Sequence, residues 1–424
     1  AFLDALAAAT RPEIAAALAS NLGHAGTPVV ELALRCAGDP ATASVVASAR
    51  DGVTVPVCVR FPAATPGAGR ACLLAGAATE QALPAAAGCP AWLVGNAGGL
   101  GYYRTVWRGP APPLPPGAPP EERLARGDDL AFALRRGELS AAAALAEIAA
   151  LAGSRDPYDA LAALEIARAL DRFADPVRRA WTAWLAGRFA GRLTREPLLQ
   201  PRSIVELVAR GQLVALAGGA IGPDIAAAAR ARLARWPAGE RDPAVLAVAA
   251  ARDAGGLFDA MVRAAAGARD GAARAAALEE LGAFPAVFAP RVVELALDPR
   301  FSAERVWPAV AAMLGRGETR AAAWRAIRPR FGPLIAALGP AGARDAIAAL
   351  GGLCDPAARA ELAVAAAPEL AAIPDGARTI DRALAAIDRC AGRRAVVGDL
   401  AAALAASPAP APRAPRPRPA GRGL

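Results

Sequence analysis

A glycine-rich run at residues 95–107 marks a border that any fold of this chain has to accommodate. The run reads GNAGGLGYYRTVW. Its glycines follow an apolar run at residues 91–94 and precede a second β-like run that begins at Tyr102. Because glycine permits tight turns, the pattern predicts a turn inside a sheet. Before this run the sequence is β-like. After it, a proline-rich bridge leads into an Ala/Leu/Arg-rich sequence with helical character almost to its end.

The first part of the chain alternates between apolar and polar residues. The alternation is clear at residues 30–34 and 53–61, and Asp51-Gly52 supplies a turn signal between them. A period of two indicates strands with one buried face. Several such strands at about ten-residue spacing, with no helix between them, predict a small antiparallel β-sandwich over residues 27–108. In residues 1–22 the apolar spacing is instead helical, with a break at Arg11-Pro12.

Proline and helical periodicity organise the rest of the chain. Residues 109–120 are rich in proline and are expected to form an extended linker. Apolar residues then recur at helical spacing over residues 121–406, in short stretches with no heptad seam, which predicts a HEAT-like α-solenoid. The predicted fold class is therefore α+β multidomain and mainly α. Residues 407–424 are Pro/Ala/Arg-rich, lack an apolar pattern and are expected to be disordered.

Asp-Pro dipeptides predict where several of these helices begin. The aspartate is a good side-chain acceptor for an N-cap, and proline fits the first helical position because its missing N–H has no partner there. The dipeptides are Asp156-Pro157, Asp175-Pro176, Asp242-Pro243, Asp298-Pro299 and Asp355-Pro356.

Charge and hydropathy exclude two classes of protein. All 48 basic residues are arginine, and the formal net charge is +9. Most arginines are interleaved with acidic residues, and no DNA- or RNA-reading motif accompanies them, so nucleic acid is not an expected partner. The sequence has no run of about 18 or more strongly apolar residues, so no transmembrane segment is expected.

The six cysteines leave the compartment open. Four lie in the β-like part and two, Cys354 and Cys390, in the helical part. No C-x-x-C pair is present, which argues against a zinc ribbon or thioredoxin chemistry. The even count is compatible with three disulfides in an exported protein, and buried free cysteines fit a cytoplasmic one equally well. The oligomeric state is likewise open.

The motif Asn96…Gly101-Tyr102-Tyr103-Arg104 resembles the sequence that closes the β-sandwich of aminopeptidase N-type zinc metallopeptidases, the gluzincin aminopeptidases. Further resemblances are colinear with it and together span roughly the whole chain. Residues 2–30 resemble the family's exit from its catalytic domain, residues 124–140 its first C-terminal helix, and residues 353–390 its last helices. The resemblance implies that residues 1–26 are the helical end of a catalytic domain that lies outside this sequence.

The catalytic chemistry of that family is missing from this chain. Family members bind zinc through His-Glu-x-x-His on a helix and a further glutamate. This sequence has one histidine, His24, in a glycine-bounded loop, and it lacks the family's Gly-Ala-Met-Glu-Asn motif for the substrate's amino group. We therefore expect no catalytic residue, metal or cofactor in this chain, which should be inactive alone. The resemblance implies zinc in the missing catalytic domain.

The resemblance implies a specific function for the chain. It would be the non-catalytic C-terminal portion of a zinc-dependent aminopeptidase that removes N-terminal residues from peptides. In such proteins the helical domain caps the active-site cavity and gates or size-selects peptides, which are bound through the catalytic domain. The alternative is a stand-alone, non-catalytic helical-repeat binding scaffold that has lost the peptidase domain. The start at Ala1 without a methionine favours the first interpretation.

The motif residues Asn96, Gly101, Tyr102, Tyr103 and Arg104 are expected to have a structural, interdomain role. Adjacent tyrosines on a strand face opposite sides, so one should enter the core while the other faces the helical domain. The arginine should hold the boundary through a carboxylate or backbone carbonyls.

Three clustered arginines, Arg325, Arg328 and Arg330, are speculative ligands for the C-terminal carboxylate of a peptide. The planar fork of arginine donors fits a carboxylate bidentately. The alternative is that they are ordinary surface arginines. Two carboxylate pairs, Asp128-Asp129 and Glu279-Glu280, are adjacent in sequence and diverge by about 100° on a helix, so we interpret them as a solvated face or a first-turn cap.

Overall fold

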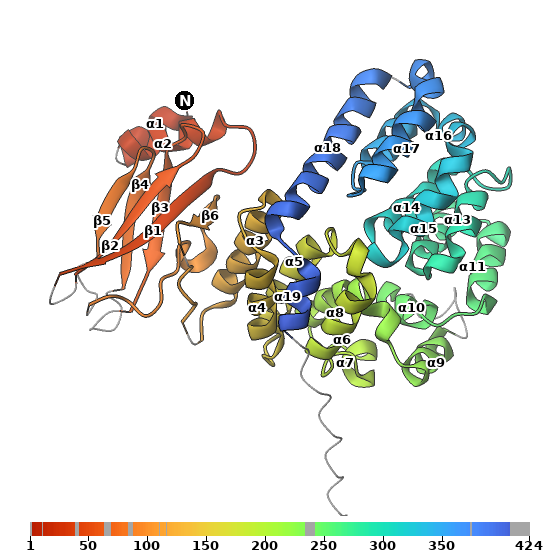
Figure 1. Cartoon of the computed structure of the whole chain (residues 1–424), viewed down its shortest axis with the longest axis horizontal. Helices are drawn as coiled ribbons and strands as arrows, with labels where there is room; N and C mark the ends of the chain where they lie inside the picture. The colour runs from red at the N-terminus through yellow and green to blue at the C-terminus, as the bar shows by residue number, and fades with distance from the viewer. Residues whose placement is uncertain are drawn as a thin grey trace, which may run out of the picture. The chain divides into compact units, whose positions relative to one another are not determined.

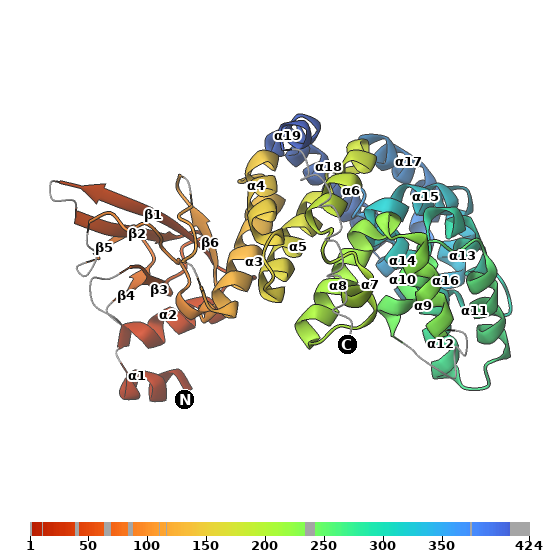
Figure 2. The same ribbon diagram turned by 90° about the horizontal axis from the view of Figure 1, so that it is seen from below.

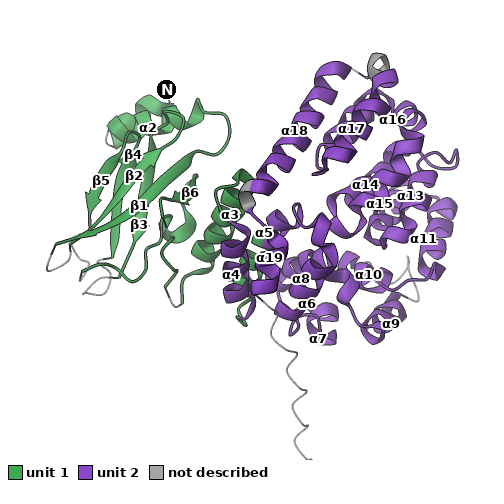
Figure 3. Cartoon of the chain, in the orientation of Figure 1, with its two compact units in different colours: residues 1–139, 154–166 green, residues 140–153, 167–424 purple. Residues whose placement is uncertain are grey.

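The structure is a computed structural model in which the chain is mainly helical with a small mixed sheet (Figures 1 and 2). The chain forms two compact units. One consists of residues 1–139 and 154–166, and the other of residues 140–153 and 167–424 (Figure 3). The structure describes residues 2–10, 12–38, 42–62, 69–83, 88–109, 111–115, 117–233, 242–373 and 375–407. The predicted disordered tail, residues 407–424, lies outside the described residues except for Ser407.

The first unit begins with two helices that pack against each other, α1 (Phe2–Ala9) and α2 (Pro12–Leu22). Pro12 is the first residue of α2, where the sequence predicts a break. Six strands follow: β1 (Val29–Ala37), β2 (Thr42–Ala49), β3 (Val55–Arg60), β4 (Arg70–Ala75), β5 (Thr79–Ala82) and β6 (Arg104–Trp107).

The strands form two sheets. One has four strands in the order β5-β2-β1-β6, and the other is the antiparallel pair β3-β4 (Figure 1). The prediction of a purely antiparallel arrangement is wrong for one pair, because β6 runs parallel to β1 with Val29 opposite Arg104. A parallel neighbour requires a long connection rather than a hairpin, and the chain between β1 and β6, which includes β2 to β5, supplies it.

The alternating residues of the sequence form one buried cluster that both sheets share. Val30 and Leu32 of β1 and Val55, Val57 and Val59 of β3 are all buried in it. Their neighbours along each strand are more exposed, as the period of two predicts for strands with one buried face. The core of the first unit therefore lies between its two sheets.

Helix α3 (Pro120–Arg136) and the first part of α5 (Pro157–Asp171) complete the first unit. The proline-rich segment before α3 has neither helix nor strand at its described residues, 109, 111–115 and 117–119. Helix α3 ends at Gly137, whose φ of 77° is left-handed, as is common at helix C-termini. The division into compact units falls after Leu139 rather than at the proline-rich segment, because α3 packs on β6.

The second unit is helical throughout its described part. Its α-helices are α4 (Ala141–Ala152), the end of α5, α6 (Arg178–Arg188), α7 (Arg195–Leu199), α8 (Ile204–Ala217), α9 (Pro223–Arg232), α10 (Pro243–Ala250), α11 (Gly256–Gly267), α12 (Gly271–Glu279), α13 (Ala289–Leu295), α14 (Ala303–Gly315), α15 (Gly317–Ile327), α16 (Phe331–Leu350), α17 (Pro356–Ala366), α18 (Gly376–Val397) and α19 (Leu400–Ala406). Short 3-10 turns join several of them: η2 (Asp175–Val177), η3 (Gly218–Ala220), η5 (Glu280–Ala283), η6 (Ala286–Phe288), η7 (Arg328–Arg330) and η8 (Ala367–Ala372).

Several pairs of helices that follow one another in sequence lie side by side in this unit. Figures 1 and 2 show this for α9 with α10 and for α17 with α18. The last helix breaks the pattern, because α19 packs against α4 and α6 at the beginning of the unit. Trp184 of α6 donates its indole N–H to the carbonyl of Ser407, so the end of α19 is held there.

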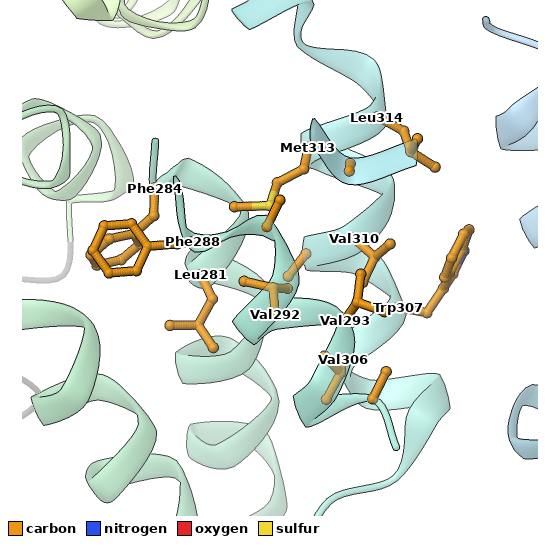
Figure 4. Close-up of a cluster of buried hydrophobic side chains, with 14 of the residues drawn as sticks. Leu281, Phe284, Phe288, Val292, Val293, Val306, Trp307, Val310, Met313 and Leu314 are labelled. Atoms are coloured by element: carbon orange, nitrogen blue, oxygen red, sulfur yellow. The ribbon is translucent and has the colours of Figure 1, made fainter. Parts of the chain in front are cut away.

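Aromatic rings fill the space where the alanine-rich helices leave room. Phe258 stacks on Phe288 with ring centroids 4.8 Å apart and meets Phe284 edge-on at 5.1 Å. Figure 4 shows Phe284 and Phe288 on one side of Leu281, with Met313 of α14 on the other. Such ring pairs stabilise a core beyond the area they bury.

The Asp-Pro dipeptides begin helices at three of the five positions. Pro157, Pro243 and Pro356 are the first residues of α5, α10 and α17. The Asp242 carboxylate accepts hydrogen bonds from the N–H groups of Ala244 and Val245, as an N-cap should.

The prediction of a helix start at Asp298-Pro299 is wrong. The next helix, α14, begins at Ala303, and the carboxylate of Asp298 binds both the backbone N–H and the side chain of Arg300. At Asp175-Pro176 the aspartate lies inside η2 rather than capping a helix. In both places the carboxylate binds an arginine side chain, a contact that a dipeptide pattern does not record.

All six cysteines form disulfides. Cys36 pairs with Cys89 and Cys58 with Cys72 in the first unit, and Cys354 pairs with Cys390 in the second. Disulfides persist in oxidising compartments, so the pairing favours the exported alternative over buried free thiols. Among the described residues, no helix has both the length and the apolar character needed to cross a membrane.

We expect the double variant Cys354→Ser, Cys390→Ser to unfold more easily than the native chain. The bond joins residues 36 apart in sequence, and a loop of that length restricts the unfolded chain enough to stabilise the fold by about 3–4 kcal/mol. Urea unfolding followed by circular dichroism measures the difference. An unchanged midpoint in the double variant would show that the bond contributes nothing to stability.

Candidate functional site

The motif residues close a turn in the first unit. The side-chain amide of Asn96 donates to the Gly101 carbonyl at 3.0 Å, and its oxygen accepts from the Gly101 N–H at 2.8 Å. A Cβ at Gly101 would lie 2.0 Å from the ring of Tyr103, so only glycine fits there. The asparagine and the glycine are therefore needed together to make this turn.

The two tyrosines of the motif have different surroundings. Tyr103 belongs to the buried cluster between the sheets, and its hydroxyl donates to the Gly95 carbonyl at 2.9 Å. Burial raises the pKa of Tyr103. Tyr102 is 72% exposed. Because β6 begins at Arg104, the tyrosines precede the strand instead of alternating along it as the sequence suggests.

The motif also contacts helix α3 through charged groups. Arg104 pairs with Asp128 at 2.9 Å. The buried carboxylate of Glu122 accepts hydrogen bonds at 2.9 Å from both Arg60 Nε of β3 and the Gly98 N–H. These contacts lie within the first unit and join the end of its sheet to the first helix that follows.

Asp129 lies on α3 directly after Asp128 and near Arg104 of β6, but its surroundings differ from those of Asp128. Burial raises the pKa of Asp129 to about 7, against the N–H of Thr105 and the charge of Arg104, which lower it. Both aspartates lie in the middle of α3, so the first-turn cap that we considered for them is wrong.

We expect Asp129 to contribute a fall in stability as the pH rises from about 4 to about 7. Over this range the folded protein keeps the Asp129 proton that the unfolded chain has lost, so raising the pH favours unfolding. The variant Asp129→Asn should remove about 2 kcal/mol of this pH dependence. Urea unfolding at several pH values measures it, and an NMR titration of the carboxyl carbon gives the pKa directly. A variant with the native pH dependence would contradict the assignment.

The three arginines proposed for a peptide carboxylate lie close together in sequence but not on one helix. Arg325 is on α15, and Arg328 and Arg330 are in η7. Arg328 pairs with Glu361, and Arg330 pairs with Glu294 at 2.8 Å. Arg325 is exposed, and its Nε donates to the carbonyl of Ala321 on its own helix. The structure does not aim the three side chains at a single point.

The second unit contains a cavity of about 450 Å³ that the sequence does not predict. Its wall comes from α8, η3, α10, α12, η5, α14 and the beginning of α15. Most of the lining is small and apolar, with Val214 and Leu246 as its larger side chains. A volume of this size is typical of small-molecule sites, which usually combine apolar walls with a few charged groups.

Four charged residues line this cavity: Glu279, Glu280, Arg316 and Glu318. Arg316 Nη1 donates to the Gly282 carbonyl at 2.8 Å, while its Nη2 lies 4.0 Å from the Glu318 carboxylate. Burial lowers the pKa of Arg316 and raises the pKa of Glu318. Three of the four charged lining residues are acidic, and burial disfavours the charged form of Glu318.

A charge network of Asp171, Asp175, Arg178 and Arg320 supports one side of the cavity. Arg178 pairs with both aspartates, and Arg320 binds Asp175 at 3.1 Å and lies 3.7 Å from Asp171. A Cβ at Gly317 would lie 2.1 Å from Arg178, so this glycine lets the guanidinium pass directly behind Arg316 and Glu318. The network thus fixes the segment that carries two of the charged lining residues.

Sequence reasoning missed this cavity. It treated Glu279-Glu280 as a solvated face or a first-turn cap, but the pair lies at the C-terminal end of α12 and the start of η5, where both residues line the cavity. The available signal was Gly315-Arg316-Gly317-Glu318, in which two glycines alternate with two charged residues between helical stretches. A glycine lacks a Cβ and so leaves room for another part of the chain to approach the backbone.

Two glycines in the cavity wall are expected to respond in opposite ways to alanine. A Cβ at Gly211 of α8 meets nothing within 4 Å, so Gly211→Ala should stabilise the helix by about 0.5–1 kcal/mol. A Cβ at Gly282 would lie 2.7 Å from Ala312 Cβ, so Gly282→Ala should cost about 1–3 kcal/mol. Urea unfolding of both variants tests this. Equal effects would contradict the packing described around the cavity.

Within the described ranges, no group of three or more His, Cys, Asp or Glu side chains is placed to hold a metal ion. No protein-family model matches the sequence, and no curated protein matches it. A crystal structure of Legionella pneumophila aminopeptidase A in complex with aspartic acid is a distant structural neighbour, with a TM-score of 0.38 and 11% sequence identity. The similarity covers 87% of this chain and 50% of that chain, so this chain spans about half the length of that aminopeptidase.

Proposed function

We propose that this chain is the non-catalytic C-terminal portion of a zinc-dependent aminopeptidase that removes N-terminal residues from peptides. The observation that carries the proposal is the motif from Asn96 to Arg104, with its resemblance to the sequence that closes the sandwich in gluzincin aminopeptidases. The colinear resemblances before and after it support the same assignment. Zinc would be bound by a catalytic domain outside residues 1–424.

The contacts of the motif support this proposal. A short motif can arise from composition alone in a chain so rich in glycine and alanine. Here, however, Asn96 and Gly101 bind each other, Tyr103 and Arg104 each have a partner of their own, and Glu122 of α3 binds the turn at Gly98. Because each residue type is required by its contact, the motif has a structural reason to exist.

The proposal includes a finer description of the fold. The two sheets of residues 27–108 would be the β-sandwich spacer, and the helices of residues 121–406 an irregular HEAT-like α-solenoid. The solenoid would cap the active-site cavity of the parent enzyme and gate or size-select its peptides. Arg325, Arg328 and Arg330 would be candidates for the far end of the peptide, with Arg325 favoured because the other two already pair with glutamates.

The second candidate is a stand-alone binding scaffold without a peptidase domain. The cavity of the helical unit favours it, because a site of about 450 Å³ can bind a ligand without any catalytic partner. The two candidates differ in whether the native polypeptide that contains these residues catalyses zinc-dependent hydrolysis of peptides.

The test compares this chain with the complete polypeptide that contains it. We expect the complete polypeptide to release amino acids from aminoacyl anilides and peptides, to lose activity with a zinc chelator and to recover it with zinc. This chain, purified in the same way, should release none. A polypeptide that lacks residues 121–424 should lose its preference for peptide length if the helices select by size.

Two outcomes would contradict the proposal. Hydrolysis by this chain alone would show that it carries its own catalytic group. A complete polypeptide with no zinc-dependent hydrolysis, tested on peptides with all classes of N-terminal residue, would leave the binding scaffold as the working assignment.

A further inference from the structure

We propose that the cavity in the helical unit binds a neutral apolar molecule that carries a carbonyl oxygen, such as an aromatic ketone. The inference concerns a ligand site and does not depend on the aminopeptidase assignment. Two observations define the ligand: a donor atom in the cavity wall that makes no hydrogen bond to the described residues, and the small apolar side chains that surround the space in front of it.

Arg316 supplies the donor atom. Its Nη1 donates to the Gly282 carbonyl at 2.8 Å and, at 3.4 Å, to the Phe284 carbonyl. Its Nε and Nη2 make no hydrogen bond to any residue that the structure describes. Nε is enclosed by the protein and Nη2 is not, so Nη2 is the donor that a ligand in the cavity can reach. A largely buried donor without a partner costs free energy, which a ligand oxygen would recover.

The carboxylate of Glu318 does not take up this donor. It lies 4.0 Å from Arg316 Nη2, so the two groups attract each other by charge but are too far apart for a hydrogen bond. Glu318 instead accepts a hydrogen bond from the Gly219 N–H, and the charge of Arg178 also acts on it. The guanidinium therefore has a charge partner but an unused N–H. An uncharged carbonyl oxygen would satisfy that N–H without adding a charge next to Glu318.

The rest of the wall suits the apolar body of such a ligand. Alanine, glycine and proline dominate the lining contributed by α8, α10, α12 and η5, so long side chains do not fill the space between these helices. A Cβ at Gly211 of α8 would meet nothing within 4 Å, which shows open space beside that helix. A volume of about 450 Å³ accommodates a substituted ring with its carbonyl group. Removing the ring from water favours its binding there.

The donor is held in place before a ligand arrives. The bond from Arg316 Nη1 to the Gly282 carbonyl ties the guanidinium to η5. The next residue, Gly317, packs against Arg178, which its ion pairs with Asp171 and Asp175 fix in turn. A donor that is already ordered loses little freedom when a ligand binds, so its hydrogen bond adds to affinity.

The test uses the full chain and four fluorinated probes of similar shape: para-fluoroacetophenone, para-fluoroisopropenylbenzene, para-fluorobenzoate and para-fluorobenzylammonium. The isopropenyl probe has a methylene group in place of the ketone oxygen, so it isolates the hydrogen bond. The other two probes test for an anion site and a cation site. Fluorine NMR titrations give the affinities of such weak ligands. We expect the ketone to bind roughly tenfold more tightly than the isopropenyl probe, because only the ketone satisfies Arg316 Nη2, and more tightly than either ion.

Three variants locate the binding. Arg316→Met removes the donor but keeps a long side chain, and it should reduce the preference for the ketone over the isopropenyl probe to less than about twofold. Arg305→Met makes the same change at an exposed position of α14 outside the cavity lining and should leave the preference unchanged. Gly211→Phe directs a ring from an open position of the wall into the cavity and should abolish binding of both probes. Circular dichroism confirms that each variant is folded.

The outcomes separate this ligand class from its alternatives. Equal binding of the ketone and the isopropenyl probe would show an apolar cavity without an oxygen site and would overturn the proposal. Tightest binding of the benzoate or of the benzylammonium would overturn it in favour of an ionic ligand. A ketone preference that survives Arg316→Met, binding that survives Gly211→Phe, or no binding of the ketone at about 10 mM would also contradict it. If Arg316→Met does not fold, the four probes on the native chain and the Gly211→Phe variant still decide.

Discussion

The ion pairs among Asp171, Asp175, Arg178 and Arg320 are the interaction on which the helical unit most depends. Arg320 and Asp171 expose only 4% and 6% of their side chains, and isolated charges at such depth would cost several kcal/mol each. Together they compensate one another, and Trp181 adds an indole N–H to Asp171. The network joins the end of α5 and the start of α6 to α15, which are far apart in sequence. This junction fixes the part of the cavity wall that carries Arg316 and Glu318.

Much of the local structure could be predicted from the sequence, because it depends on neighbouring residues. The alternation at residues 53–61 gives strand β3, and Asp242-Pro243 gives the start of α10. The parallel pairing of β1 with β6 could not be predicted, because it is set by a connection and not by the pattern of either strand. Asp298 failed as a helix start because its carboxylate binds the N–H and the guanidinium of Arg300 within a turn, before the next helix begins at Ala303.

The candidate site was less accessible to sequence reasoning than the fold. The motif at Asn96 to Arg104 stood out because several of its residues are close in sequence and serve one turn. The cavity draws single residues from helices spread over more than a hundred positions, and most of them are alanine or glycine, which no chemical motif distinguishes. Burial decides the properties of its charged groups, as the raised pKa of Glu318 shows, and burial is a property of the packed unit.

The most direct test of the account is the mass of the native polypeptide in its source cell, detected through peptides from residues 121–400. The account predicts a product roughly twice the 42.7 kDa of this chain, with a His-Glu-x-x-His sequence ahead of Ala1. A native product that begins at or near Ala1 would contradict it. In that case the helical unit and its cavity would have to act without a peptidase domain.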